Sequence, residues 1–235
     1  MMRFVNKLKH ILNRVLNTVP HHSIYRDLSH SAGEPPELIS LLKKLPTDAV
    51  TMNIGSLGKD LRSLHPGIIN LDISYYLNVD LIGDATQLPL RDESIDMIIF
   101  KNVLEHIKGP QMALNEIERV LKKGAYLYVK VPFLQPFHAV PDDYQRYTEN
   151  GIKELFKGYQ QLDFAVSVGP GSMMSWLLRE YLAILTSFGN QKLYRIGIFI
   201  WGWLTFWIKY FDLLFRNNQF ASRISSAFYG VYQKV

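Results

Sequence analysis

The sequence predicts an α/β protein: a Rossmann-like, mostly parallel sheet with helices on both faces, an antiparallel last strand and a helical hydrophobic insertion before that strand. Two observations lead to this class. From residue 35 onward, short β-branched runs alternate with segments of helical periodicity. The run over 95–100, Ile-Asp-Met-Ile-Ile-Phe, is almost continuously apolar, as expected for a central strand that is buried on both sides.

The individual elements follow from apolar periodicity and from the positions of proline and glycine. Helices are expected over 37–44, 112–122 and 149–156. Strands are expected over 48–54, 67–73, 79–82, 95–100, 125–131, 161–168 and 227–235. The first strand runs directly into a glycine turn, Gly55-Ser-Leu-Gly58.

Three regions are expected along the chain: residues 1–34, an α/β domain built from 35–169 together with 221–235, and the insertion at 170–220. The first region reads as an N-terminal amphipathic helix followed by a polar linker. Scattered basic residues interrupt its apolar positions, which is unlike a secretory signal peptide. Two interpretations stay open: the helix packs on the domain, or it lies on a bilayer.

Composition excludes several kinds of protein. The chain has no cysteine, which rules out disulfides, a cysteine-ligated zinc site and a cysteine nucleophile. Its 26 basic and 21 acidic residues give a net charge of +5 without a dense basic run, so no nucleic-acid partner is expected. A mild basic excess also suits contact with an anionic membrane surface.

Three features after successive strands point to a nucleotide-like ligand. Gly55 and Gly58 allow the backbone to approach a ligand closely. Asp72, at the end of the second strand, can accept hydrogen bonds from both hydroxyls of a ribose. Asp84, after the third strand, can accept from an adenine amino group. Each feature alone is weak evidence for such a ligand, whereas the combination of all three is far more specific.

At these residues the sequence resembles the class I S-adenosylmethionine-dependent methyltransferases, over about 45–165 and the last strand. The matching runs are Asn53-Ile-Gly-Ser-Leu-Gly58, Asn70-Leu-Asp-Ile73, Gly83-Asp-Ala-Thr-Gln-Leu-Pro-Leu90, Asp92-Glu-Ser-Ile-Asp-Met97, Asn102-Val-Leu-Glu-His-Ile107 and the Leu-Lys-Lys-Gly run at 121–124. The resemblance implies S-adenosylmethionine as cofactor. It implies that the methionine part faces Asn53, Gly55, Ser56 and Gly58, the ribose Asp72, the adenine Asp84 and Ala85, and the sulfonium region Asn102.

Two departures from the family pattern affect the methionine end of this site. Asn53 stands where the family usually has an acidic residue, and Leu57 with a shifted Gly58 replaces the usual glycine spacing. A neutral amide offers less to the cofactor's ammonium group. A non-catalytic relative that binds a membrane or a partner protein is therefore the alternative function.

Candidates for acceptor chemistry follow the fourth and fifth strands. His106, in Glu105-His106, and His138 are the candidate proton acceptors. The segment 132–147 resembles a signature of methyltransferases found among polysaccharide genes, and it contributes the candidate substrate-binding residues Asp142, Asp143, Tyr144 and Arg146. Arg146 can pair with either aspartate or bind an acidic substrate, and a purely structural clasp is the competing interpretation. Nothing in the sequence indicates a metal.

The insertion carries all four tryptophans and a charge-free run over 196–208. Thirteen residues are too few to span a bilayer, and tryptophan suits the lipid boundary. A helix sunk into one leaflet, a helical lid or homodimer contact, and a true span are the three interpretations. The expected function is methylation, at an oxygen, of a glycan, lipid-linked sugar or other small acceptor by a cytoplasmic, membrane-associated enzyme.

Overall fold

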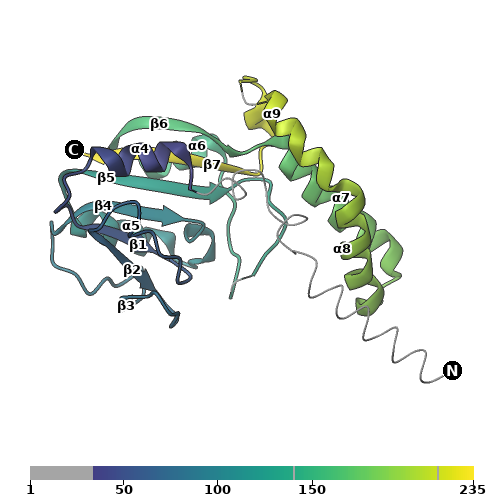
Figure 1. Ribbon diagram of the computed structural model, residues 1–235, viewed down its shortest axis with the longest axis horizontal. Helices are drawn as coiled ribbons and strands as arrows, with labels where there is room; N and C mark the ends of the chain where they lie inside the picture. The colour runs from purple at the N-terminus through teal and green to yellow at the C-terminus, as the bar shows by residue number, and fades with distance from the viewer. Residues whose placement is uncertain (1–33, 140, 216) are drawn as a thin grey trace.

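The computed structural model describes residues 34–139, 141–215 and 217–235 (Figure 1). The expected N-terminal amphipathic helix, and all of its linker except Glu34, lie outside this part of the chain. The described elements are, in order, α4 (Pro36–Lys44), β1 (Thr51–Ile54), β2 (Ile68–Asp72), β3 (Leu81–Ile82), β4 (Ile95–Lys101), η1 (Leu104–His106), α5 (Pro110–Val120), β5 (Leu121–Pro132), α6 (Glu149–Leu155), β6 (Tyr159–Val168), α7 (Pro170–Ser187), α8 (Gln191–Thr205), η2 (Phe206–Phe211), α9 (Asp212–Phe215), η3 (Ala221–Ile224) and β7 (Ala227–Lys234).

The strands form one seven-stranded sheet in the order β3-β2-β1-β4-β5-β7-β6. Strands β1 to β5 pair in parallel, whereas β7 pairs antiparallel with both β5 and β6. The order reverses between β1 and β4: the chain first builds outward to β3 and then returns to the other side of β1. Ligands of open α/β sheets bind at such a switch point, beyond the carboxyl ends of the strands.

Helices cover both faces of the sheet, as expected. On one face, α5 and α6 pack against alternate strand residues such as Ile98 and Phe100. On the other face, α4 packs against the intervening residues Met97 and Ile99. This alternation explains the apolar run over 95–100, because both sets of side chains are fully buried.

Some boundaries differ from the sequence expectations. The helix expected to reach residue 122 ends at Val120, and the next strand begins at Leu121 rather than at 125. Leu121 is drawn into the sheet because it pairs with Ile95, and a register shift follows before the pair Met97 and Tyr126. The strand expected over 79–82 is reduced to its last two residues, which pair with the end of β2.

Helices α7 and α8 form a hairpin that lies side by side and projects beyond the sheet (Figure 1). The carboxylate of Asp212 ties the base of this hairpin, because its two oxygens accept from the backbone N–H groups of Gly171 (2.6 Å) and Ser172 (3.0 Å). These donors belong to the first turn of α7, where a carboxylate is favourable. The charge-free run over 196–208 therefore falls in α8 and the start of η2.

Candidate functional site

The glycine turn after β1 lies at the switch point, next to the carboxyl end of β4. Gly55 and Gly58 have φ angles of +69° and +71°, which explains why the turn needs glycine. A Cβ on Gly55 would lie 2.3 Å from Cγ2 of Val103, and one on Gly58 would lie 2.7 Å from Cβ of Tyr76. The turn is thus a backbone surface pressed between the segments that follow β4 and β2.

Asp72 ends β2 and holds the same turn. Its Oδ2 accepts from the N–H of Leu57 at 2.8 Å, and its Oδ1 accepts from the N–H of Ser74 at 3.0 Å. The residue is 4% exposed. One hydrogen bond at each oxygen leaves each with a further lone pair, so the carboxylate can fix the turn and still accept from a diol.

The other predicted cofactor residues occupy the same region with varied surroundings. Asn53 is buried, and its Nδ2 donates to Oδ1 of Asn70 on β2. Asp84 is exposed and accepts from both the N–H and the hydroxyl of Thr86 at 2.8 Å. Ala85 is buried in the core.

Ser56 and Asn102 complete the predicted set. Ser56 is buried, and its hydroxyl accepts weakly from the N–H of Gly58 at 3.3 Å. Asn102 has a φ of +54° directly after β4, a conformation that asparagine tolerates better than most residues. Its N–H donates to the carbonyl of Lys130 on β5 at 2.8 Å.

Sequence reasoning missed an ion cluster around the buried carboxylate of Glu34, beside this turn. The carboxylate of Glu34 pairs with Lys59, one residue after the turn, and with Lys101 at the end of β4. Burial raises the pKa of Glu34, but the two lysines outweigh it and hold that pKa below its ordinary value. Lys101 could have been noticed in the sequence, since a lysine ends a mostly apolar strand, whereas no pattern marked Glu34.

The acceptor-side histidines meet at one point. His106 lies in η1 and His138 in the segment after β5, and their rings are in edge-to-face contact with centroids 5.4 Å apart. Glu105 lies beside both and is fully buried. Its carboxylate raises the pKa of His138, helped by the Pro136 carbonyl and Asp143 and opposed by burial.

Asp143 and Arg146 build the loop that carries His138. Two guanidinium nitrogens of Arg146 bind the two oxygens of Asp143, and the same guanidinium donates to the carbonyls of Gln135 and Pro136. Hydrogen bonding to Arg146 lowers the pKa of Asp143 to about 2. Of the two possible aspartate partners, Arg146 thus pairs with Asp143. The structural contact that was the competing interpretation therefore lies within this loop and not between the loop and a helix.

Asp142 and Tyr144 are exposed and bond to each other, the tyrosine hydroxyl donating to the carboxylate at 3.1 Å. Their side chains are available to an acceptor, whereas the Asp143 side chain is 1% exposed and committed to Arg146. Asp143 and Arg146 hold this loop together, and substrate contact by Asp142, Asp143, Tyr144 or Arg146 stays a prediction.

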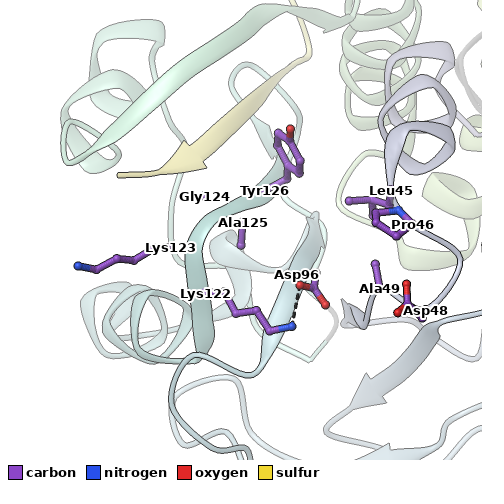
Figure 2. Close-up of a pocket in the computed structure, with 10 residues that line it drawn as sticks. All are labelled: Leu45, Pro46, Asp48, Ala49, Asp96, Lys122, Lys123, Gly124, Ala125 and Tyr126. Carbon is purple, nitrogen blue, oxygen red and sulfur yellow. Dashed lines mark hydrogen bonds and ion pairs between the residues drawn. The ribbon is translucent and has the colours of Figure 1, made fainter.

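A separate pocket of about 350 Å³ lies at the opposite edge of the sheet. It is lined by Leu45, Pro46, Asp48, Ala49, Asp96, Lys122, Lys123, Gly124, Ala125 and Tyr126 (Figure 2). The Lys122–Asp96 ion pair crosses it. These residues precede β1 or begin β4 and β5, so the pocket is remote from the glycine turn and from the histidines.

Comparison with known proteins agrees with this geometry. Residues 62–129 match a family model described as a methyltransferase domain. A stretch of 108 residues is 31% identical to a ubiquinone/menaquinone biosynthesis C-methyltransferase of a Ruegeria species, covering 46% of this chain and 37% of that protein. A stretch of 137 residues is 28% identical to a tRNA (carboxymethyluridine(34)-5-O)-methyltransferase of Arabidopsis thaliana, covering 52% and 33%.

The matched part thus spans about a third of the length of these curated relatives. Among solved structures, a putative sarcosine dimethylglycine methyltransferase from Galdieria sulphuraria aligns with a TM-score of 0.55, over 84% of this chain and 83% of that one, at 14% identity. That likeness shows a shared fold.

Strand order, glycine turn and strand-end carboxylate define a Rossmann-like α/β domain of the nucleotide-binding kind. Together with the match of residues 62–129 to a methyltransferase-domain model, this fold supports a likeness to the class I S-adenosylmethionine-dependent methyltransferases.

Proposed function

We propose that this protein transfers a methyl group from S-adenosylmethionine to an oxygen of an acceptor held beyond β4 and β5. The observation that carries this proposal is the turn at Gly55, whose backbone is confined by Val103 and fastened by Asp72 at the switch point of the sheet. The cofactor supplies an activated methyl group on a positive sulfur, so the protein's task is mainly to position the acceptor.

The residues at this edge fit the parts of the cofactor. The methionine part lies along the backbone of Gly55, Ser56 and Gly58, whose two glycines pack against Val103 and Tyr76. Asp72 retains lone pairs for the ribose hydroxyls, and Asp84 keeps its Oδ2 for the adenine amino group next to Ala85. Asn53 takes part indirectly, because its amide is bonded to the neighbouring strand.

The acceptor side is formed by the loop that Arg146 fastens. The Nε2 atoms of His106 and His138 both lie near Oε1 of Glu105 there. We expect methyl transfer to need both histidines. Asp142 and Tyr144 offer exposed polar groups to the acceptor. A sugar hydroxyl, free or on a lipid carrier, is the acceptor that we propose, supported by the resemblance of 132–147 to methyltransferases of polysaccharide genes.

Calorimetric titration with S-adenosylhomocysteine tests the cofactor site. Asp72→Ala is expected to weaken binding by about 1–3 kcal/mol, because hydroxyl donors lose their acceptor and the turn loosens. Asp48→Asn, in the pocket at the opposite edge, is the matched control and should bind like the wild type. If the folded wild type does not bind at millimolar ligand, the non-catalytic alternative replaces this proposal.

We further propose that the α7–α8 hairpin rests in one leaflet of a membrane. The interface between its helices is made of small and polar residues: Ser175 and Thr205 bond to each other's backbone carbonyls, and Gly197 lies against Ala183. Large apolar side chains face outward instead, at Tyr181, Ile184, Leu185, Phe188, Ile196, Ile200, Leu204 and Trp207. This inside-out arrangement is typical of helix pairs that pack in lipid.

The position of charged residues favours partial immersion over a full span. Helical residues Gln191–Phe215 form one stretch whose length and mean hydropathy of 1.3 meet the criterion for a spanning segment, and 17% of that window is buried. Lys192 and Arg195 lie exposed near the tip of the hairpin, where they suit lipid phosphates better than the bilayer centre. A lipid-linked acceptor would then meet the site at the membrane surface.

Flotation with anionic phospholipid vesicles tests the hairpin. Ile200→Gln with Leu204→Gln should reduce the floated fraction severalfold, because both side chains are about half exposed on the outward face. Met112→Gln with Leu162→Gln removes comparably exposed apolar groups elsewhere and should float unchanged. Equal flotation of the two double variants would contradict the proposal.

A further inference from the structure

Three potential metal ligands converge from two segments on the acceptor side. Glu105 and His106 lie in η1, and His138 lies in the segment after β5. Oε1 of Glu105 is 3.8 Å from Nε2 of His106 and 3.9 Å from Nε2 of His138. The ligand atoms of all three residues lie within 4.8 Å of one another.

The environment of the Glu105 carboxylate would favour a bound cation. It is fully buried, and neither of its oxygens accepts a hydrogen bond from the residues that the structure describes. A buried carboxylate without hydrogen-bond donors is unfavourable, since it has lost water and only the nearby imidazoles offset that loss. The two imidazoles at its edge are too distant for hydrogen bonds but close enough to share an ion.

The outer contacts of both histidines are compatible with a lone pair on the nitrogen that faces Glu105, although Nη2 of Arg146 also lies 3.4 Å from Nδ1 of His138. Nδ1 of His106 lies 2.5 Å from the backbone carbonyl of Asp142, and Nδ1 of His138 lies 3.0 Å from that of Pro136. A neutral imidazole that donates from Nδ1 carries its lone pair on Nε2. Metal-binding histidines show this pattern, in which a carbonyl fixes the tautomer and the ring orientation.

We propose that Glu105, His106 and His138 bind one divalent transition-metal ion through Oε1 and the two Nε2 atoms. Two imidazoles and a carboxylate suit Zn²⁺, Co²⁺ or Mn²⁺. Ligand atoms around a tetrahedral ion lie about 3.4 Å apart, so closing the present 3.8–3.9 Å separations needs only small side-chain rotations. The cluster was invisible in the sequence because His138 reaches it from a distant loop.

The position of the ion gives it a place in the reaction, a step that rests on the proposed function. Glu105 is two residues from Val103, whose side chain confines Gly55 of the cofactor turn. Three protein ligands leave a coordination position open, where an acceptor hydroxyl would bind and become more acidic. It would release its proton to water, and its oxygen would then take the methyl group as the carbon–sulfur bond of the cofactor breaks, leaving S-adenosylhomocysteine. The histidines would then act on the acceptor proton as ligands and not as direct bases.

Metal binding is measured on the full chain without reference to methyl transfer. After chelator treatment, Zn²⁺ is titrated calorimetrically, and Co²⁺ is added to record its visible d–d absorption. Glu105→Gln removes a charged ligand at constant shape, and His138→Gln removes an imidazole that is only partly buried. Asp142→Asn is the matched control, because the exposed carboxylate changes while the carbonyl that orients His106 remains.

We expect the wild type and Asp142→Asn to bind with similar affinity and to give the same tetrahedral Co²⁺ spectrum. Each ligand variant should lose at least tenfold in affinity, and the spectrum should change or vanish. The comparison between variants is needed because His10, His21, His22 and His30 can also take up Zn²⁺. Unchanged affinity and spectrum in His138→Gln would overturn the proposal, as would absence of wild-type binding at millimolar metal.

Thermal unfolding gives a second readout. Bound metal should raise the melting temperature of the wild type, and the gain should disappear in Glu105→Gln. In the presence of chelator, Glu105→Gln should have a higher melting temperature than the wild type. The reason is that the variant no longer buries a carboxylate without hydrogen-bond donors. A wild type that binds S-adenosylhomocysteine but shows no metal effect would refute the ion alone and leave the proposed function intact.

Discussion

At the scale of single residues, the site is shaped by contacts that admit almost no other side chain. Gly55 has a left-handed backbone and touches Val103, while Asp72 receives the N–H of Leu57. These contacts join the segments after β1, β2 and β4. A substitution at one of these residues should therefore disturb the packing of all three segments.

Gly55→Ala is expected to destabilise the protein by about 2–4 kcal/mol, combining the strain of a positive φ with overpacking against Val103. Gly158→Ala is the control, since a Cβ there meets nothing within 4 Å. Urea unfolding followed by circular dichroism measures both. If the two variants had equal midpoints, the close packing of the turn would be disproved.

The pair formed by Glu34 and Lys101 should make stability depend on pH. The lysines hold the pKa of Glu34 below its ordinary value of 4.5, so its contribution is complete above that value and is lost as the pH falls through the depressed pKa. The stability difference between wild type and Glu34→Gln should therefore be largest near neutral pH and shrink in acid. Urea titrations over a series of pH values check this, and a difference independent of pH would contradict it.

At the scale of elements, the fold separates two tasks. The parallel strands β1 to β5 place the segments that follow all five of them at one edge, and the α7–α8 hairpin stands apart from them on its own small-residue interface (Figure 1). The hairpin is joined to the sheet through β6 before it and β7 after it, and Asp212 secures its base. Its internal packing can therefore be altered separately from the glycine turn.

Gly197→Val should separate the two helices, because the first added carbon already lies 3.1 Å from Cα of Ala183. The expected cost is about 1–3 kcal/mol, expressed as faster amide hydrogen exchange within α7 and α8. Ile196→Val changes an exposed neighbour and should leave exchange unaltered. Binding of S-adenosylhomocysteine should persist in both variants; its loss in Gly197→Val would show that the hairpin and the cofactor edge are coupled.

At the scale of the whole molecule, the outward apolar face of the hairpin should govern association. In water this face favours contact between copies, which is how the homodimer contact left open by the sequence would arise. Sedimentation is expected to give species heavier than 27.2 kDa without detergent and the single-chain mass in mild detergent micelles. Ile200→Gln with Leu204→Gln should shift the detergent-free sample toward the single chain, and an unchanged distribution would place the contact elsewhere.

The sequence alone was sufficient for the Rossmann-like sheet and the glycine turn. Apolar periodicity records which face of each strand and helix is buried, and glycine at Gly55 and Gly58 records a local backbone requirement; both are properties of short segments. The antiparallel β7 was likewise expected, and the main errors were at segment ends, such as Leu121, where pairing with Ile95 overrides the local helical pattern.

Only the tertiary structure decided which polar side chains meet. Glu34 joins Lys101 across 67 residues, and Glu105 meets His138 from the loop that Arg146 fastens. Such pairs depend on strand order and on the path of the connections, neither of which leaves a periodic trace in the chain. The same holds for the hairpin: the apolar composition of 170–220 was visible, but three-dimensional packing determined that small residues face inward and large apolar ones outward.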